Sequence, residues 1–104
     1  MWVLREESVD VEKACQPLTF RIMPGSMKTI GRMRNADFVI EHTLVSRIHC
    51  RLINQDGHLE VEDLDSANGT YVNNQKIQRA RLAAGDKLRI GHVELVVSNE
   101  PISD

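Results

Sequence analysis

A serine, an arginine and a histidine lie close together in the segment LVSRIHCRL, residues 44–52. Ser46 and His49, with Asp63 or Asp65, are the residue types of a Ser-His-Asp nucleophilic triad. Such a triad needs a serine on a strained turn, oxyanion donors and a substrate pocket. Ser46 and His49 are close neighbours at the entrance of an apparent strand, so His49 is better placed to brace its loop than to accept the serine proton. We therefore expect no enzymatic activity from this cluster.

The histidines and cysteines do not have the spacing of a metal site. His49 and Cys50 are adjacent, and adjacent side chains on a strand point to opposite faces. His42, His58 and His92 have no ligand-like spacing to one another or to a pair of cysteines. We expect neither a metal nor another cofactor, and we expect Cys50 to pack as a small hydrophobic side chain.

Three separate polar segments could instead bind an anion. The first contributes the arginine Arg32. The second contributes a hydroxyl and a second arginine, Ser46 and Arg47, and the third is a small polar turn with Ser66, Asn68 and Gly69. The planar fork of arginine suits phosphate, and hydroxyl and backbone N–H groups complete such a site. Each segment alone would fit a solvated turn. The prediction of an anion site therefore depends on the fold bringing the three together.

The rest of the chain predicts that strands position these segments. Short β-rich segments are separated by polar residues, Pro or Gly, and they occupy residues 1–4, 18–22, 28–31, 38–40, 48–53, 59–64, 70–72, 75–77, 87–90 and 93–97. No segment keeps a helical period. Asp56-Gly57 predicts a tight hairpin turn. Many short strands at close spacing predict an all-β sandwich or barrel.

The composition fits one domain and excludes some classes of protein. The chain has 104 residues, of which 41% are hydrophobic and 27% charged, and its formal net charge of −2 disfavours direct binding of nucleic acid. No apolar run approaches the ~18 residues that a membrane span needs, and the N-terminus does not have the pattern of a signal peptide. Two cysteines are too few for a disulfide framework. We therefore expect an intracellular protein, nuclear or cytoplasmic, with no membrane partner.

The ordered set GR at 31–32, SRIH at 46–49 and NGTYVN at 68–73 resembles the forkhead-associated domain. The similarity continues through AAGDKLRIGHVELVV at 83–97, so it covers nearly the whole chain. The resemblance implies an all-β sandwich of about eleven short strands in two antiparallel or mixed sheets. The polar segment SNEPISD that ends the chain is typical of a tail or the start of a linker, so we expect the domain at residues 1–98 and a tail or linker start at 99–104. The resemblance also implies binding of a phosphothreonine-containing protein or peptide through loops at one end of the sandwich.

The resemblance further implies roles for individual residues. Contacts to phosphate are expected from Arg32, Ser46 and Arg47. Asn68 is expected to bond the peptide backbone beside the phosphothreonine. Gly31 is expected to allow a sharp turn before Arg32, and further structural support of the site is expected from His49, Gly69, Thr70 and Asn73.

One position departs from a familiar pattern of this family. Some members carry an arginine two residues before the serine, where it reads an acidic side chain three residues after the phosphothreonine. This chain has Leu44 there. We therefore expect Leu44, with Thr43 and Ala67, to shape the contact to that peptide residue, and we do not expect an acidic preference by that route.

The opening Met-Trp is similar to the start of nibrin-like proteins, which carry this domain at their N-terminus and act in the DNA damage response. The alternative is that Trp2 is a core residue of the first strand. An alternative function is a phosphate-independent scaffold or oligomerisation sandwich. The presence of both Arg32 and Ser46 favours phosphothreonine binding, because a scaffold needs neither.

Overall fold

Short strands make up the secondary structure of the chain. The computed structural model describes residues 1–7 and 18–101. Within these ranges there are eleven strands: β1 (Trp2–Glu6), β2 (Thr19–Ile22), β3 (Met27–Gly31), β4 (Phe38–Val39), β5 (Cys50–Gln55), β6 (His58–Asp63), β7 (Thr70–Val72), β8 (Gln75–Ile77), β9 (Arg79–Leu82), β10 (Lys87–Ile90) and β11 (Val93–Asn99). The described ranges hold no helix that is long and apolar enough to cross a membrane.

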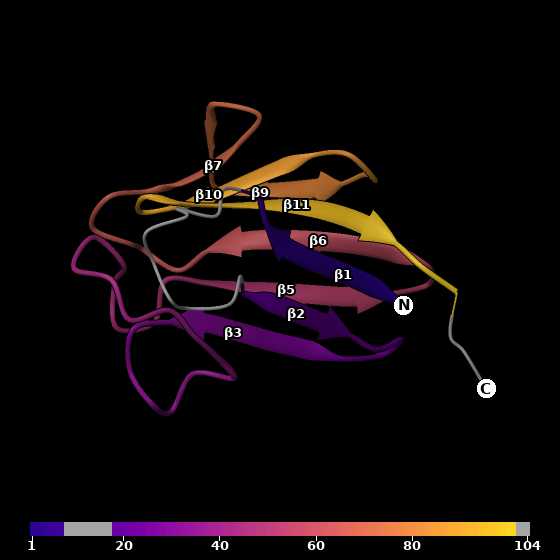
Figure 1. The fold of residues 1–104 in the computed structure, drawn as a ribbon, viewed down its shortest axis with the longest axis horizontal. Helices are drawn as coiled ribbons and strands as arrows, with labels where there is room; N and C mark the ends of the chain where they lie inside the picture. Colours follow the sequence, from indigo (N-terminus) through magenta and orange to yellow (C-terminus); the bar gives the residue numbers. More distant parts are fainter. Residues whose placement is uncertain (8–17, 102–104) are drawn as a thin grey trace.

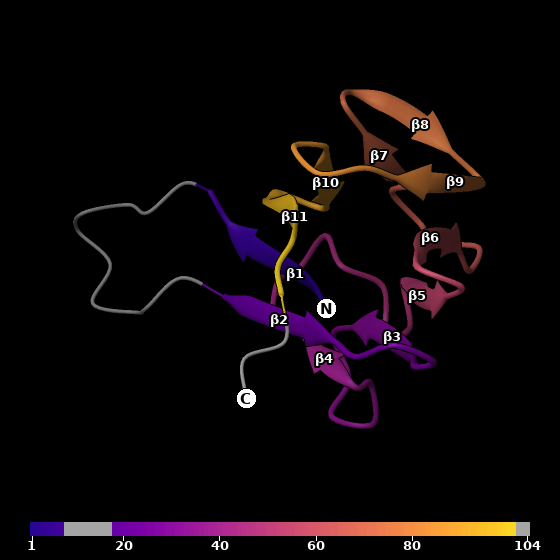
Figure 2. The same cartoon turned by 90° about the vertical axis from the view of Figure 1, so that its right-hand side faces the viewer.

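The strands form two sheets that face each other across one core (Figures 1 and 2). The six-stranded sheet has the order β2-β1-β11-β10-β7-β8, and its pairs are all antiparallel. The five-stranded sheet has the order β4-β3-β5-β6-β9 and is mixed, because β3 and β4 run parallel. The predicted all-β sandwich of antiparallel and mixed sheets is confirmed.

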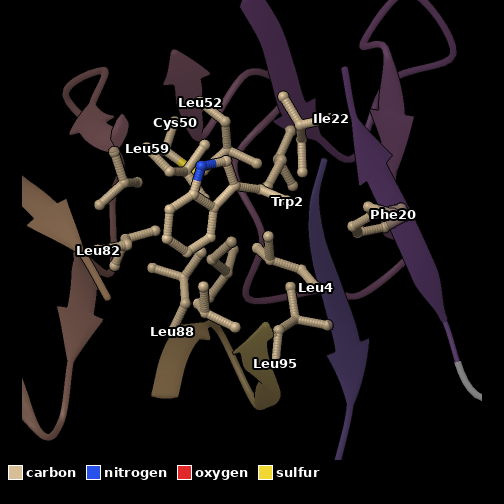
Figure 3. Close-up of a cluster of buried hydrophobic side chains, with 14 of the residues drawn as sticks. Trp2, Leu4, Phe20, Ile22, Cys50, Leu52, Leu59, Leu82, Leu88 and Leu95 are labelled. Atoms are coloured by element: carbon tan, nitrogen blue, oxygen red, sulfur yellow. The ribbon is translucent and has the colours of Figure 1, made fainter. Parts of the chain in front are cut away.

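The core lies between the two sheets and consists of apolar side chains from alternate strand positions. In β5 and β6 the buried and less buried residues alternate along the strand, as expected when one face of a strand is packed and the other is wet. Figure 3 shows the Trp2 indole in the middle of this cluster, near Cys50 and Leu88. Trp2 is only 8% exposed and Cys50 is fully buried. Trp2 is thus a core residue of β1, and Cys50 packs as predicted.

The β5–β6 hairpin has the turn that its sequence predicts. Its two loop residues, Asp56 and Gly57, have positive φ angles of 55° and 77°. Positive φ at both central positions is the mark of a type I′ turn, for which Asp-Gly is a preferred pair. One strand was not predicted: β9, with the sequence RARL, pairs with β6 at the edge of the five-stranded sheet. It contains no β-branched or aromatic residue, so its composition gave no strand signal.

The β3–β4, β4–β5 and β6–β7 loops project from the same end of the sandwich, on the left in Figure 1. The N-terminus and the end of β11 lie at the opposite end. There the amide of Glu100 donates to the Met1 carbonyl at 2.8 Å, and the Met1 amino group donates to the Glu100 carbonyl at 3.0 Å. Backbone pairing between the two ends of the described chain therefore continues from β1 and β11 to Met1 and Glu100.

Candidate functional site

Three loops enclose one groove at the end of the sandwich. They are residues 32–37 between β3 and β4, residues 40–49 between β4 and β5, and residues 64–69 between β6 and β7. The groove has a volume of about 380 Å³ and is lined by Arg32, Thr43, Leu44, Val45, Ser46, Arg47, Ile48, Ala67 and Asn68. All the residues expected to contact phosphate, peptide backbone or the neighbouring peptide side chain lie on it. The fold thus brings the polar segments together.

Arg32 is held against the β4–β5 loop by its backbone and its side chain. Its amide donates to the Ser46 carbonyl at 3.0 Å, and its Nε donates to the Val45 carbonyl at 3.0 Å. The side chain is otherwise exposed. A guanidinium carries five N–H donors, so this contact fixes the direction of Arg32 and leaves the terminal nitrogens for an anion.

Gly31 supports the site by allowing two backbones to approach closely. A Cβ atom at this position would lie 2.1 Å from the carbonyl oxygen of Arg47. Gly31 is not among the residues with positive φ, so the structural requirement visible here is the close approach and not a left-handed backbone. Without a side chain, β3 can lie directly against the loop that carries Arg47, and Met33 bonds the Arg47 carbonyl from its amide at 3.2 Å.

Ser46 bridges two of the three loops through its hydroxyl. Its Oγ accepts a hydrogen bond from the amide of Ala67 at 2.9 Å. A serine hydroxyl has one proton to donate besides its acceptor lone pairs. The contact with Ala67 uses an acceptor site only, so the hydroxyl proton is available to a ligand in the groove. Arg47 follows with an exposed side chain on the same groove.

His49 connects the β4–β5 and β6–β7 loops from below the groove. It is fully buried, its Nδ1 accepts the Ser46 amide at 3.1 Å, and its Nε2 lies 2.9 Å from the Gly69 carbonyl oxygen. A carbonyl only accepts, so Nε2 carries the proton and donates it. Both ring nitrogens are therefore bonded to backbone groups, and neither contacts the Ser46 hydroxyl. This geometry is that of a brace and not that of a triad.

Asp63 organises the β6–β7 loop, a role that was not predicted from the sequence. Its carboxylate accepts hydrogen bonds from the Thr70 hydroxyl at 2.7 Å, from the Ser66 amide at 3.2 Å and from the Ser66 hydroxyl. Ser66 Oγ in turn accepts the Gly69 amide at 3.0 Å. The short spacing between Asp63 and Ser66 is typical of side chains that bond nearby backbone in turns, and this was the available signal.

These bonds also set the charge state of Asp63. Burial alone would raise its pKa, but the hydrogen bonds donated by Ser66 and Thr70 outweigh burial, so the pKa of Asp63 lies below the ordinary value. The carboxylate is therefore ionised at neutral pH and acts as the acceptor that holds the loop. Thr70, which donates one of these bonds, is fully buried.

Asn68 spans the groove from the β6–β7 loop to the β4–β5 loop. Its Nδ2 donates to the Leu44 carbonyl at 2.9 Å, while the residue itself is exposed. Thr43 and Ala67 line the groove beside it. Asn73 lies on a different turn: it bonds Asp86 and the amide of Lys87, each at 3.0 Å. Asn73 thus ties the β7–β8 turn to the start of β10 and does not line the groove.

The groove is positively charged. Arg32 and Arg47 both line it, and its lining residues include no Asp or Glu. Within the described ranges neither guanidinium makes an ion pair. No described group of three His, Cys, Asp or Glu side chains could hold a metal ion, and burial raises the pKa of the Cys50 thiol far above its usual value. The site is suited to an anion.

Comparison with known proteins identifies the family. The family model of the FHA (forkhead-associated) domain matches residues 28–91. The chain is 44% identical over 80 residues to the FHA domain-containing protein FhaA of Mycobacterium tuberculosis, and 39% identical over 82 residues to the ABC transporter ATP-binding/permease protein Rv1747 of the same organism. These matches cover 76% and 79% of this chain but only 15% and 9% of those proteins.

Solved structures agree with the sequence matches. The FHA domain of FhaA, in a crystal structure with the intracellular domain of Rv3910, has a TM-score of 0.79 and 33% identity, and the match covers 94% of this chain and 100% of that chain. A structure from a study of phosphothreonine-dependent FHA domain interactions has a TM-score of 0.78 and 33% identity, with 97% and 98% covered. The sequence and the fold thus have their counterpart in one family, and this chain belongs to the forkhead-associated domains.

Proposed function

We propose that the groove at the end of the sandwich binds a phosphothreonine peptide, with Arg32, Ser46 and Arg47 holding the phosphate. Forkhead-associated domains bind phosphothreonine peptides in phosphorylation-dependent protein–protein interactions. The observation that carries the assignment to these residues is their convergence: two guanidinium groups and a serine hydroxyl with a free proton line one groove that has no carboxylate. A phosphate dianion needs this combination of charge and donors.

Each donor has a different part in this proposal. Arg32 lines the groove, and its Nε is bonded to the Val45 carbonyl, so the guanidinium is oriented before the ligand arrives. Ser46 donates its hydroxyl proton to a phosphate oxygen. Arg47, whose side chain is exposed, adds a second positive charge. A hydrogen bond to a charged group contributes roughly 1.5–3 kcal/mol, so the phosphate supplies most of the affinity.

Asn68 fixes the peptide main chain beside the phosphothreonine. Its Nδ2 already bonds the Leu44 carbonyl, which leaves the side-chain oxygen as an acceptor for a peptide amide. Several bonds of this kind, offset by the cost of ordering a flexible peptide, give binding in the micromolar range, about −8 kcal/mol. This affinity suits reversible signalling.

We further propose that the domain acts by binding alone. Both nitrogens of His49 are bonded to backbone groups, so the histidine cannot also activate Ser46. A phosphate-independent scaffold is the other function that the same sandwich could have. It would not require a groove lined by two unpaired arginines.

The test is a titration of the domain with a phosphothreonine peptide library and its unphosphorylated copy. We expect binding to a subset of the phosphorylated peptides and none to their unphosphorylated counterparts. A phosphoserine copy of each peptide measures how much the threonine methyl group contributes to the binding free energy. Burial of the methyl group alone predicts a contribution of ~0.8 kcal/mol. Equal binding to phosphorylated and unphosphorylated peptides would establish the scaffold and refute the proposal.

A further inference from the structure

Next to the groove, the β6–β7 loop is covered by side chains that the phosphate site does not use. Gly69 follows Asn68 directly. A Cβ atom at Gly69 would lie 2.9 Å from Cε of Lys76 and 3.3 Å from Cε1 of Tyr71. The methylene stem of Lys76 and the ring of Tyr71 therefore lie on the backbone of Gly69. Gly69 itself is buried, so the surface beside Asn68 is formed by the Lys76 and Tyr71 side chains that cover it.

Arg89 completes this surface from the neighbouring strand. Tyr71 on β7 is paired with Lys76 on β8 and with Arg89 on β10, and Figure 2 shows β8, β7 and β10 in that order. The Arg89 guanidinium carbon lies 4.4 Å from the centroid of the Tyr71 ring, within the range of a cation–π contact. Directly paired residues of a sheet project from the same face. We call Lys76, Tyr71 and Arg89 the lateral patch.

The charges of the lateral patch are not neutralised within the described residues. Neither Lys76 nor Arg89 makes an ion pair there, whereas Arg5, Arg51, Arg79 and Lys87 all do. Glu94 is paired with Arg89 across the strands, but its carboxylate lies 3.7 Å from the Lys87 ammonium instead. Unpaired cations on a sheet face are commonly just solvated. Here Lys76 covers Gly69, the neighbour of Asn68, and Asn68 lines the groove together with Arg32 and Arg47, in a chain whose net charge is −2.

We propose that the lateral patch binds acidic side chains that flank the phosphothreonine of the ligand. This inference rests on the proposed function of the groove. A peptide held at Asn68 can continue over the Lys76 and Tyr71 side chains that cover Gly69, and its residues follow one another at ~3.3 Å. Aspartate or glutamate a few residues from the position bonded by Asn68 then meets Lys76 or Arg89. The patch selects among phosphothreonine ligands by charge, separately from the contact at Leu44.

The experiment compares three phosphothreonine peptides: one with neutral flanks, one with glutamates on the N-terminal side and one with glutamates on the C-terminal side. Each is titrated against the wild-type domain and against Lys76→Met, Arg89→Gln and Arg81→Gln. Lys76→Met keeps the apolar stem on Gly69 and removes only the charge. Arg81→Gln is the matched control, because Arg81 is exposed on β9 of the other sheet.

We expect the wild type to bind one acidic peptide about two- to fivefold more tightly than the neutral peptide, the range of exposed ion pairs. That advantage should shrink with added salt and fall in Lys76→Met and Arg89→Gln but not in Arg81→Gln. All four proteins should bind the neutral peptide equally. An equal loss in Arg81→Gln, or no acidic preference in the wild type, would overturn the inference while leaving the groove intact. Failure of the wild type to bind any phosphopeptide would instead refute the proposed function itself.

Discussion

Ser46 and His49 contact each other through the backbone amide of the serine and the ring of the histidine, at 3.1 Å. The hydroxyl of Ser46 points elsewhere, to the amide of Ala67. The histidine therefore positions the serine without changing its chemistry, and the serine remains an ordinary hydroxyl donor. This relationship is the reason why the cluster that resembles a catalytic triad is better suited to hold an anion than to attack a substrate.

Replacement of Arg32 by alanine should weaken phosphopeptide binding by more than ~1.5 kcal/mol, because a charged acceptor loses its donors. The free energy of unfolding should change little, since the side chain is exposed. Calorimetric titration and chemical denaturation measure the two effects. Arg34→Ala is the control: it removes the same charge from the same loop, but Arg34 does not line the groove. Normal binding by a folded Arg32→Ala protein would show that the assignment is wrong.

Replacement of His49 by alanine should reduce both stability and binding. It leaves the Ser46 amide and the Gly69 carbonyl without their partner, and each such group costs roughly 1–3 kcal/mol when it stays buried. Urea denaturation should show the loss, and phosphopeptide affinity should fall because the two loops are no longer joined. His58→Ala, on the exposed start of β6, should change neither. A fully stable His49→Ala protein that has lost binding would instead place the histidine in contact with the ligand.

Replacement of Leu44 by arginine should shift the preferred residue three positions after the phosphothreonine toward Asp or Glu. Leu44 lines the groove beside Thr43 and Ala67, and an apolar side chain there desolvates a carboxylate without compensating it. The gain should be ~0.2–1 kcal/mol, since the new ion pair is exposed, and salt should diminish it. A position-scanned phosphopeptide array of wild type and variant measures it. Identical arrays at that position would mean that Leu44 does not select sequence.

Asp63 should make the domain sensitive to acid. Its pKa in the folded chain is lower than usual, so its contribution to stability is complete above the ordinary carboxyl pKa of ~3.9 and is lost as the pH falls through the folded-state value. The difference in unfolding free energy between wild type and Asp63→Asn should therefore be largest near neutral pH and shrink toward pH ~2. Denaturation curves across this range measure it. A difference that is independent of pH would show that the carboxylate charge does not hold the loop.

The sequence predicted much of this structure because the relevant signals are local. The Asp56-Gly57 turn and the alternation in β5 and β6 depend on neighbours in the chain, and both were confirmed. β9 was missed because its residues have little strand propensity, and its place depends on pairing with β6. The same holds for Gly31, whose requirement arises from Arg47, a residue distant in sequence but adjacent in space.

In the groove, too, some features could be predicted from the sequence and others depend on the folded structure. Its polar residues were recognised by type and order, and the fold brings them to one end. The structural role of Asp63 could not be predicted from the sequence. That role depends on the burial of the carboxylate and on its simultaneous hydrogen bonds to Ser66 and Thr70. The packing around a carboxylate decides whether it is an ordinary turn residue or the acceptor of several hydrogen bonds that hold a loop together.

The pairing of Met1 with Glu100 has a mechanical consequence. The two residues are neighbours across antiparallel β1 and β11, so a pulling force applied through them acts on one hydrogen-bonded pair at a time, as in opening a zipper. Peeling of this kind needs less force than shearing all the pairs of a strand together. The loops that line the groove lie at the opposite end of the sandwich (Figure 1), so tension would first separate β1 from β11 and would reach the groove last.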